Sequence, residues 1–435
     1  MRKTLILLSL LSAVGLSAQG TYFPPTTGTT WETVDPASLG WCIDSIQPLL
    51  DFIDANNSKA FIVLKDGRIA IEHYTGTFTQ DSMWYWASAG KSLTAFLVGK
   101  AQADGLLDIN APSSNYLGTG WTSCTPEQEG AITVRNQLTM TTGLDDAVAD
   151  LDCTDPACLT YLTDPGTRWS YHNAPYTLLD GVIGSATGGT LNSYVFNTLT
   201  ATTGIAGLYL PTGYNNVFYS KPRAMARFGL LALNRGVWNG TDILGDDDYF
   251  EAMTTPSQSL NPSYGYLWWL NGQPSFMAPG SQFVFPGSMA PNAPADMVSA
   301  LGKNGQQLNV VPSMGLVVVR MGNPPDGIGA AVAVLFNDEV WQHLSHVLCT
   351  PTSIPATVAD ASFMLYPDPA QDRLHIRTNS QRITAVEAIG MDGRRHPLLW
   401  SSDEVDVRSL APGTYALFMR MSDGSIGLQR FQIVR

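Results

Sequence analysis

The sequence is poor in charged residues, and the charge that it does carry is mostly negative. Only 14% of the 435 residues are charged, the formal net charge is −13 at pH 7, and the chain has seven lysines. Binding of nucleic acid depends on Lys and Arg that neutralise phosphates. We therefore expect neither nucleic acid nor an anionic membrane surface as a partner. Beyond the N-terminus no run is apolar and long enough to span a membrane, so the sequence predicts no transmembrane segment.

Three common catalytic or nucleotide-binding motifs are also absent. There is no Gly-x-Ser-x-Gly, which excludes the nucleophile elbow of the α/β-hydrolases, and no His-Glu-x-x-His zinc motif. Gly90-Lys91-Ser92 resembles the end of a phosphate-binding loop, but that loop needs a glycine where Tyr85 stands. His343 and His346 are spaced for one helix face without an obvious third ligand, so we interpret them as surface or packing residues.

The first 18 residues look like a secretory signal. Arg2 and Lys3 precede an apolar run from Leu5 to Leu16, and Ser17-Ala18 provides a small-residue cleavage site. The run is shorter than the about 20 residues that cross a bilayer. We therefore expect an exported protein that is secreted or held at the cell surface.

Five cysteines in an exported chain indicate two disulfides and one unpaired thiol. Cys153 and Cys158 are close enough in sequence to close a small loop. We expect Cys42 to pair with Cys349, which would tie the first helix of the main domain to its last. Cys124 would then be free.

Strand patterns occupy both ends of the main part of the chain, with helical patterns between them. The segment 61–71 has the form of a hairpin with an Asp-Gly turn, and strand patterns return at 264–269, 297–301, 307–311 and 316–321. Residues 88–220 look mostly helical with long loops. This order predicts an α+β fold, in which one antiparallel sheet is built from both ends and flanked by helices and a helical subdomain.

Composition changes after residue 350. Residues 351–361 resemble a linker, and residues 362–435 contain nine arginines and no lysine. Short alternating segments between Asp-Gly and Pro-Gly turns predict a small all-β sandwich. We therefore divide the chain into a signal peptide (1–18), a main domain (19–350), a linker (351–361) and a C-terminal β-sandwich (362–435).

Ser88-Ala89-Gly90-Lys91 is the only Ser-x-x-Lys motif in the chain, and it stands at the start of a predicted helix. Residues i and i+3 share one helix face, so the two side chains can meet. A serine becomes a strong nucleophile when a base takes its proton, and a lysine amine is such a base when burial lowers its pKa. Ser88 and Lys91 are therefore a candidate nucleophile and base. A chance tetrapeptide with a solvated lysine is the alternative.

Tyr171-His172-Asn173 is the best second element, because it follows a Pro-Gly turn and precedes a helical pattern. A tyrosine beside a lysine ammonium would have a lowered pKa and could act as base and then as acid. Asn173 could hydrogen-bond both Lys91 and a substrate amide. The sequence Tyr214-Asn215-Asn216 has the same Tyr-x-Asn form without the turn, so we favour Tyr171.

Gly302-Lys303-Asn304-Gly305-Gln306 is the third element and lies between two strand patterns. Lys303 would place positive charge along one wall of a cleft, and Gly305 would let a substrate approach the backbone. The amide of Gln306, with that of Ser88, could form an oxyanion hole. The alternative is a glycine-rich hairpin with a solvated lysine.

Together and in this order, the three motifs resemble those of the serine β-lactamase and penicillin-binding hydrolase family, especially its class C-like, esterase-type branch. The resemblance covers about residues 32–350. It implies a two-lobed fold with Ser88 as the acylated nucleophile, Lys91 as its base and Tyr171 as partner base and acid. Asn304 stands where the family usually has Thr or Ser, so we expect acyl transfer rather than efficient hydrolysis of β-lactams.

The C-terminal part resembles the sorting domain that the type IX secretion system recognises. The resemblance rests on Tyr366-Pro367-Asp368-Pro369-Ala370 and on the segments 392–395 and 410–415. The family usually has Asn at the position of Asp368. A generic β-sandwich binding module is the alternative.

These resemblances imply a secreted serine hydrolase that forms a covalent acyl-serine intermediate on an ester, amide or peptide. One alternative is a peptidase directed at D-amino acids or peptidoglycan, or a penicillin-binding protein. The other is a non-catalytic binding protein on the same fold. We expect no cofactor and no metal. The expected partners are a small-molecule or peptide substrate and, through the C-terminal domain, the secretion machinery.

Overall fold

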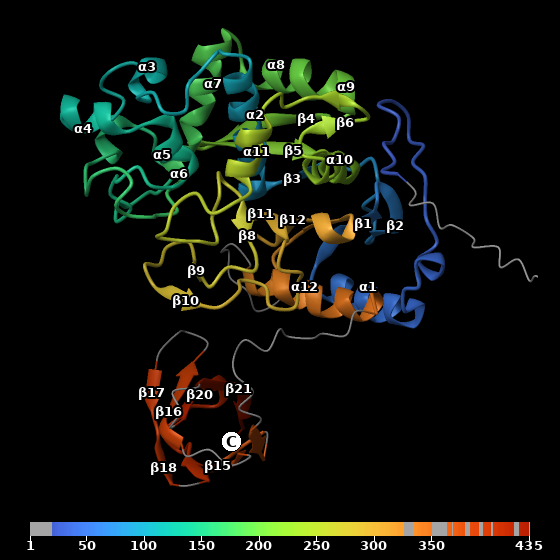
Figure 1. Cartoon of the computed structure of the whole chain (residues 1–435), viewed down its shortest axis with the longest axis vertical. Helices are drawn as coiled ribbons and strands as arrows, with labels where there is room; N and C mark the ends of the chain where they lie inside the picture. Colours follow the sequence, from blue (N-terminus) through green and yellow to red (C-terminus); the bar gives the residue numbers. More distant parts are fainter. Residues whose placement is uncertain are drawn as a thin grey trace, which may run out of the picture. The chain divides into compact units, whose positions relative to one another are not determined.

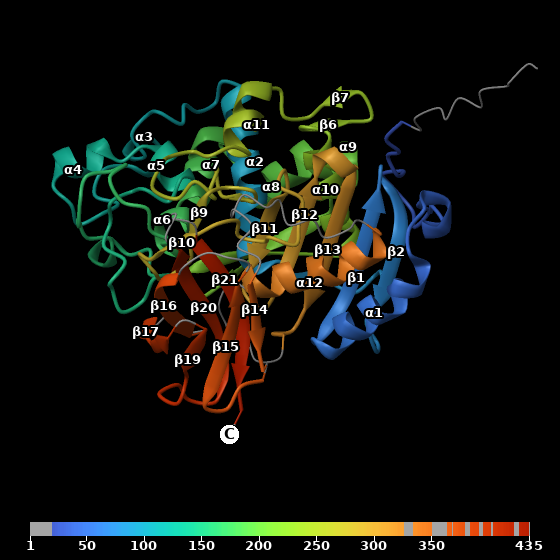
Figure 2. The same ribbon diagram turned by 60° about the horizontal axis from the view of Figure 1, so that its bottom comes forward.

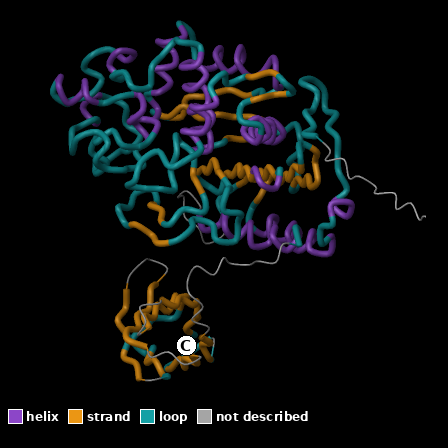
Figure 3. Tube along the Cα trace, viewed as in Figure 1, coloured by secondary structure: helices purple, strands orange, loops and turns teal. Residues whose placement is uncertain are grey.

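The computed structural model describes residues 20–325, 334–349, 363–367, 369–378, 383–390, 395–401, 403–421 and 426–434. The predicted signal peptide and linker lie outside the described residues. The chain forms two compact units, Met1–Pro351 and Thr352–Arg435, which we describe separately (Figures 1 and 3).

A six-stranded antiparallel sheet organises the first unit, in the order β2-β1-β13-β12-β11-β8. Its strands are β1 (Ser58–Lys65), β2 (Arg68–Tyr74), β8 (Trp269–Leu270), β11 (Val298–Gly302), β12 (Gln306–Val311) and β13 (Leu316–Gly322). In the pairing of β1 with β13, Ile62 lies opposite Val319. Strands from the two ends of the unit therefore meet in one sheet, which confirms the predicted α+β fold.

Helices cover both faces of this sheet (Figures 1 and 2). Because successive side chains of a strand point to opposite faces, Phe61 of β1 packs in the core with α1 (Ile46–Ala55) and α12 (Val334–Val347). Its neighbour Ile62 belongs to the core on the other face, with α2 (Gly90–Ala103) and α10 (Pro222–Leu233). The second core extends into the helical subdomain. It includes side chains of α2 and of β11, so that α2 begins next to the sheet.

The helical subdomain is built from short elements. Besides α2 and α10, it contains η3 (Ala87–Ala89), α3 (Ser114–Leu117), α4 (Pro126–Ala131), α5 (Val134–Leu138), η4 (Pro156–Cys158), α6 (Asn173–Thr177), α7 (Leu179–Thr187), α8 (Leu191–Val195), η5 (Phe196–Thr200), α9 (Ala201–Thr203) and α11 (Asp247–Met253). The smaller pieces of the unit are η1 (Pro36–Leu39), η2 (Ile43–Ser45), β6 (Val237–Trp238), β7 (Thr241–Asp242), β9 (Ser275–Met277), β10 (Val284–Pro286) and η6 (Pro312–Met314).

One part of this region differs from the prediction. The sequence predicts mostly helices with long loops for residues 88–220, but β4 (Gly207–Thr212) and β5 (Asn215–Ser220) form a hairpin that pairs with β3 (Trp84–Tyr85). The hairpin turn contains Tyr214, the competing tyrosine of the sequence. The strand expected at 264–269 is also shorter, because only Trp269 joins the sheet, in β8.

Two disulfides lie in the first unit. Cys42 pairs with Cys349 and Cys153 with Cys158, with Cα atoms 5.5 and 6.0 Å apart. These are the predicted pairings, and Cys124 is free as predicted. A separate finding concerns the membrane: among the residues that the structure describes, no helix is long and apolar enough to cross one.

The second unit consists of two four-stranded antiparallel sheets, in the orders β14-β15-β19-β18 and β17-β16-β20-β21. The strands are β14 (Phe363–Tyr366), β15 (Arg373–Thr378), β16 (Ile383–Gly390), β17 (Arg395–Pro397), β18 (Leu399–Ser401), β19 (Glu404–Asp406), β20 (Gly413–Met421) and β21 (Ile426–Ile433). Both sheets contribute to one apolar core, for example through Ile376 and Leu417. This confirms the predicted small all-β module. Asp368 and residues 391–394, on which part of the sorting-domain resemblance rests, lie outside the described residues.

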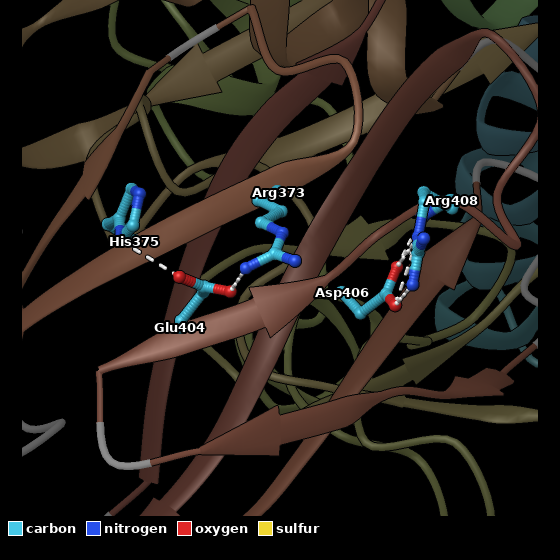
Figure 4. A network of polar contacts seen from close by, with 5 residues as sticks. All are labelled: Arg373, His375, Glu404, Asp406 and Arg408. Carbon is cyan, nitrogen blue, oxygen red and sulfur yellow. Dashed lines mark hydrogen bonds and ion pairs between the residues drawn. The ribbon is translucent and has the colours of Figure 1, made fainter.

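Charged side chains of this unit pair on its surface (Figure 4). Arg373 and His375 both contact Glu404; Nδ1 of His375 lies 4.0 Å from Oε2 of Glu404. Arg408 holds both oxygens of Asp406, with Nη2 2.5 Å from Oδ2, and these hydrogen bonds lower the pKa of Asp406 to about 2. Exposed pairs of this kind contribute little to stability because water already solvates both charges.

Candidate active site

Ser88 lies in the single turn η3, directly before α2, and lines a pocket of about 670 Å³. The preceding residue, Ala87, has φ +47°, a left-handed conformation that is uncommon for residues with a side chain. The buried Trp86 anchors the turn, because its indole N–H donates to Ser220 Oγ at 2.7 Å. The turn therefore holds Ser88 in a constrained position, as is common at functional sites.

Lys91 lies one turn into α2 and reaches back to the serine. Its Nζ donates to Ser88 Oγ at 3.1 Å and to Asn173 Oδ1 at 2.9 Å, and it sits 4.1 Å from the centroid of the Tyr176 ring. The side chain is only 4% exposed. Burial lowers the pKa of Lys91 to about 7, against the opposing effect of the Asp152 carboxylate. A substantial fraction of this amine is therefore neutral at neutral pH and able to accept a proton.

Tyr171 also meets Ser88, but its ionisation differs from the prediction. Burial raises the pKa of the Tyr171 phenol above its ordinary value, and a hydrogen bond with Ser88 only partly opposes the rise. The predicted lowering of this pKa is wrong, because the buried phenolate would lose its hydration. The Lys91 amine cannot compensate, since burial also lowers its pKa and makes it partly neutral. Stacking on the Trp269 ring, with centroids 5.9 Å apart, holds the tyrosine in place. Tyr171 is thus a protonated hydroxyl next to Ser88.

Asn173 links the amine to an acid that the sequence did not single out. Its Oδ1 accepts from Lys91, while its Nδ2 donates to Asp152 Oδ1 at 2.7 Å. Asp152 lines the pocket, as does Asn173. One amide hydrogen that we expected to contact a substrate is therefore used to bind Asp152. Nothing in the spacing of the acidic residues between 145 and 164 distinguishes Asp152; only its position beside Cys153 hinted at a fixed loop.

The third sequence element reaches the pocket in part. Lys303 and Asn304 line it, and Asn304 Nδ2 donates to Tyr85 Oη at 2.7 Å.

Gly305 and Gln306 are not among the residues that line the pocket. Gly305 is buried against Arg320, and Gln306 Nε2 donates to the carbonyl of Gly322 at 2.6 Å. The left-handed Asn304-Gly305 turn places Lys303 and Gln306 on opposite arms of a hairpin. Lys303 is thus brought to the site, and Gln306 is not.

Gly302 is a residue that sequence reasoning overlooked. A Cβ atom at this position would lie 2.5 Å from the carbonyl oxygen of Trp86 and 3.1 Å from the backbone nitrogen of Ser88. Only a glycine lets the β11 backbone come this close to the serine turn. The signal in the sequence was a glycine at the end of a strand pattern; we included it in the third element but gave it no role of its own.

The remaining lining residues are mostly amide, hydroxyl and aromatic side chains. They are Thr212, Asn215, Asn216, Val217 and Tyr219 from the β4–β5 hairpin, Tyr85 and Ala87 beside the serine turn, and Leu151, Tyr176, Pro279 and Gly280. His172 is buried and burial lowers its pKa, so it is a neutral packing residue. Within the described part of the chain, no group of three or more His, Cys, Asp or Glu side chains is placed to hold a metal ion.

A model of the Beta-lactamase family matches residues 54–343. An uncharacterized protein of Alkalihalophilus pseudofirmus is 24% identical over 318 residues, which are 64% of this chain and 87% of that protein.

Solved structures of similar fold include two of clear relevance. One is from Bacillus anthracis and has 6-aminohexanoate-dimer hydrolase activity ascribed to it; it is 18% identical with a TM-score of 0.57, over 76% of this chain and 91% of that one. The other is a penicillin-binding protein homologue from Caulobacter crescentus, 14% identical with a TM-score of 0.55, over 74% of this chain and 99% of that one. At these identities the similarity shows a shared β-lactamase/transpeptidase-like fold.

Proposed function

The chain belongs to the Beta-lactamase family, and from this premise we propose that it is a serine hydrolase that forms a covalent acyl-enzyme at Ser88. One observation carries the proposal: a buried lysine amine, with its pKa lowered to about 7, lies 3.1 Å from the Ser88 hydroxyl. An isolated buried amine is costly, and placing it against a hydroxyl makes that hydroxyl a nucleophile.

In the proposed first step, neutral Lys91 takes the Ser88 proton while Oγ attacks the substrate carbonyl. The developing oxyanion is stabilised by the Ser88 N–H and by the backbone edge of β11 beside Gly302. Tyr171, kept protonated by burial, donates its proton to the leaving group and regains one from the Lys91 ammonium. Water then attacks the acyl-serine: Lys91, neutral again, takes a proton from the water, and this proton passes to Ser88 Oγ as the bond to the acyl group breaks and the acid is released.

The proposed substrates are esters, amides or peptides. The amide side chains of Asn215, Asn216 and Asn304 suit hydrogen-bonding substrates, and Tyr85 and Tyr219 offer aromatic walls. The structure from Bacillus anthracis is named for hydrolysis of a 6-aminohexanoate dimer. Two amino acids joined head to tail are linked by an amide, which supports an amide or peptide substrate for this chain. The complete serine, lysine and tyrosine arrangement argues against a purely binding protein.

Mass spectrometry of the intact protein after incubation with a fluorophosphonate tests the proposal. We expect one adduct per chain and none with Ser88→Ala. A wild-type protein that never gains an adduct would contradict the proposal. Among p-nitrophenyl esters, a chromogenic cephalosporin and D-Ala-D-Ala peptides, we expect the esters to react fastest. Preferred cleavage of the D-Ala-D-Ala peptides would instead identify a peptidoglycan-directed enzyme.

We further propose that residues 1–18 direct export and that residues 362–435 act as a sorting domain. The two disulfides support export, because such bonds persist in oxidising compartments. Deletion of 362–435 in the native host should retain the protein inside the cell envelope. Unchanged release into the medium would contradict the sorting role.

A further inference from the structure

The segment 150–158, which we name the cystine loop, forms one wall of the catalytic pocket. Leu151 and Asp152 line the pocket. The disulfide between Cys153 and Cys158 closes the loop on itself. Asp152 is the single acidic side chain among the described residues that line this pocket.

Two contacts outside the disulfide also hold the cystine loop. The carbonyl of Leu151 accepts from the N–H of Ala174, in α6, at 3.0 Å. At its other end, Asp155 Oδ2 accepts from Tyr214 Oη at 2.7 Å, which joins the loop to the turn between β4 and β5. Asp152 is therefore fixed between α6 and the β4–β5 hairpin rather than free to move with a surface loop.

A short polar chain runs from this loop to the nucleophile. Asp152 Oδ1 accepts from Asn173 Nδ2 at 2.7 Å, Asn173 Oδ1 accepts from Lys91 Nζ at 2.9 Å, and Lys91 Nζ lies 3.1 Å from Ser88 Oγ. Because Asp152 can only accept, it fixes which end of the Asn173 amide faces the lysine. The carbonyl end stabilises an ammonium, whereas the reversed amide would oppose its formation.

Of the charged groups near Lys91, Asp152 is the one that raises the pKa of the amine. The aromatic groups facing Lys91 are Tyr171 and Tyr176, and burial raises the pKa of both, so they stay neutral at neutral pH. Lys303 lies across the same pocket and carries a like charge. Two other titratable groups lie next to these neighbours of Lys91. Asp180 raises the pKa of Tyr176, and the neutral His172 precedes Asn173 in the chain.

We propose that Asp152 is a positioning residue of the catalytic site: it orients Asn173 toward Lys91 and stabilises the ammonium that forms when Ser88 gives up its proton. The Cys153–Cys158 bridge holds it in that place. This inference rests on the proposed function, in which Ser88 is the nucleophile.

The test compares Asp152→Asn with Asp152→Ala, using the rate of fluorophosphonate labelling of Ser88 as a function of pH. Asparagine keeps an acceptor for Asn173 but removes the charge, so the pH at which labelling becomes half-maximal should fall by about one unit. Alanine also removes the acceptor, so the plateau rate of Asp152→Ala should lie up to about tenfold below that of Asp152→Asn, the value of one neutral hydrogen bond.

Asp155→Asn is the matched control, because it removes a carboxylate from the same loop, makes no contact with Asn173 and keeps an oxygen that can accept from Tyr214, so that Asp152 stays in place. Its pH profile should match that of the wild type. For the bridge, Cys153→Ser/Cys158→Ser should lower the plateau rate, whereas Cys42→Ser/Cys349→Ser should leave the plateau of the folded protein in place. An Asp152→Asn profile that coincides with the wild type would overturn the proposal.

A second readout separates this proposal from the proposed function. With seven lysines in the whole chain, the ¹³Cε resonance of Lys91 can be assigned by comparison with Lys91→Met and followed by NMR across pH. If wild-type protein shows no labelling at any pH, the proposed function fails. The Lys91 titration still tests Asp152, and an unchanged midpoint in Asp152→Asn would overturn its role.

Discussion

The two units of this chain place charge in opposite ways. The first unit buries charged side chains, among them Lys91, Glu129, Arg227 and Arg320. In the second unit, the buried side chains that the structure describes are apolar, and the ion pairs lie at the surface (Figure 4). Buried charges destabilise a fold unless they are well paired. Of these four buried charges, only Lys91 lines the proposed catalytic pocket, so the first unit buries charge both for structure and for the proposed chemistry.

Within the first unit, two buried cations show the same contrast at closer range. The Arg320 guanidinium makes five hydrogen bonds, four to backbone carbonyls and one to Ser58 Oγ, and so fixes the hairpin tip around Asn304 and Gly305. Lys91 makes two, both to side chains of the proposed catalytic site. A saturated buried cation is structural, whereas one with few partners can exchange its proton.

Lys91→Met should have the largest effect on the rate of acylation. It replaces a buried charge by an apolar side chain, as in the core of the second unit. Removing the base should slow acylation of Ser88 by about 10⁴-fold. The free energy of unfolding at pH 6 should rise by on the order of 2 kcal/mol, because the variant no longer buries a charge. Labelling kinetics and calorimetry measure the two effects. A variant that is both inactive and less stable would contradict the contrast between the units.

Loss of the Cys42–Cys349 bridge should destabilise the first unit alone. The bridge closes a loop of 307 residues, and the chain-entropy model assigns about 6 kcal/mol to such a loop. In Cys42→Ser/Cys349→Ser we expect the unfolding transition of the first unit to move to a lower temperature, with that of the second unit unchanged. Equal shifts of both transitions would show that the units do not unfold independently.

Gly302→Ala should harm the site more than the fold. The new Cβ would lie 2.5 Å from the Trp86 carbonyl oxygen, so the serine turn must move, and a displacement near 1 Å costs about 10²-fold in rate. Gly130→Ala, in α4, meets nothing within 4 Å and is the control. Matching labelling rates for the two variants would argue against Gly302 as part of the site.

The pH profile of wild-type labelling should report the lysine. Since the pKa of Lys91 is lowered to about 7, the rate should rise about tenfold per unit below pH 7 and level off above it. The unfolded chain holds this proton up to its ordinary pKa of 10.5, so stability from this group should also rise with pH between about 7 and 10.5. A rate that falls across this range would exclude Lys91 as the base.

Asp406→Asn should have the smallest effect. Its ion pair with Arg408 lies on the surface of the second unit, where water and salt screen the interaction. We expect no measurable change in either unfolding transition or in labelling. A clear drop in the transition of the second unit would show that its surface charges stabilise it after all.

The fold was predictable because its signals are local and repeat. Period-two apolar segments at both ends, together with the Asp-Gly hairpin, identified the sheet, and the spacing of Ser88 and Lys91 located the proposed nucleophile and base. The β4–β5 hairpin escaped prediction because its turn, Gly213-Tyr214, leads into Asn215, and we weighed Tyr214-Asn215-Asn216 as a possible site motif instead.

The other errors concern burial and direction, which one sequence does not display. The pKa of Tyr171 depends on the aromatic packing around it, and that packing comes from Trp269, far along the chain. Gln306 points to β13 because an Asn-Gly turn reverses the chain before it. Asn-Gly is a strong hairpin signal, so this second error was avoidable.

The pairing of β1 with β13 has a consequence for how the protein matures. The partners Ser58 and Gly322 are separated by most of the unit, and contacts between such distant segments form late because loop closure must precede them. Gly302 and Lys303 likewise join the serine turn only after the last third of the unit exists. A chain still emerging from the ribosome therefore has Ser88 and Lys91 but not all the residues that line the pocket, so the proposed reaction would have to wait until synthesis of the unit is nearly complete.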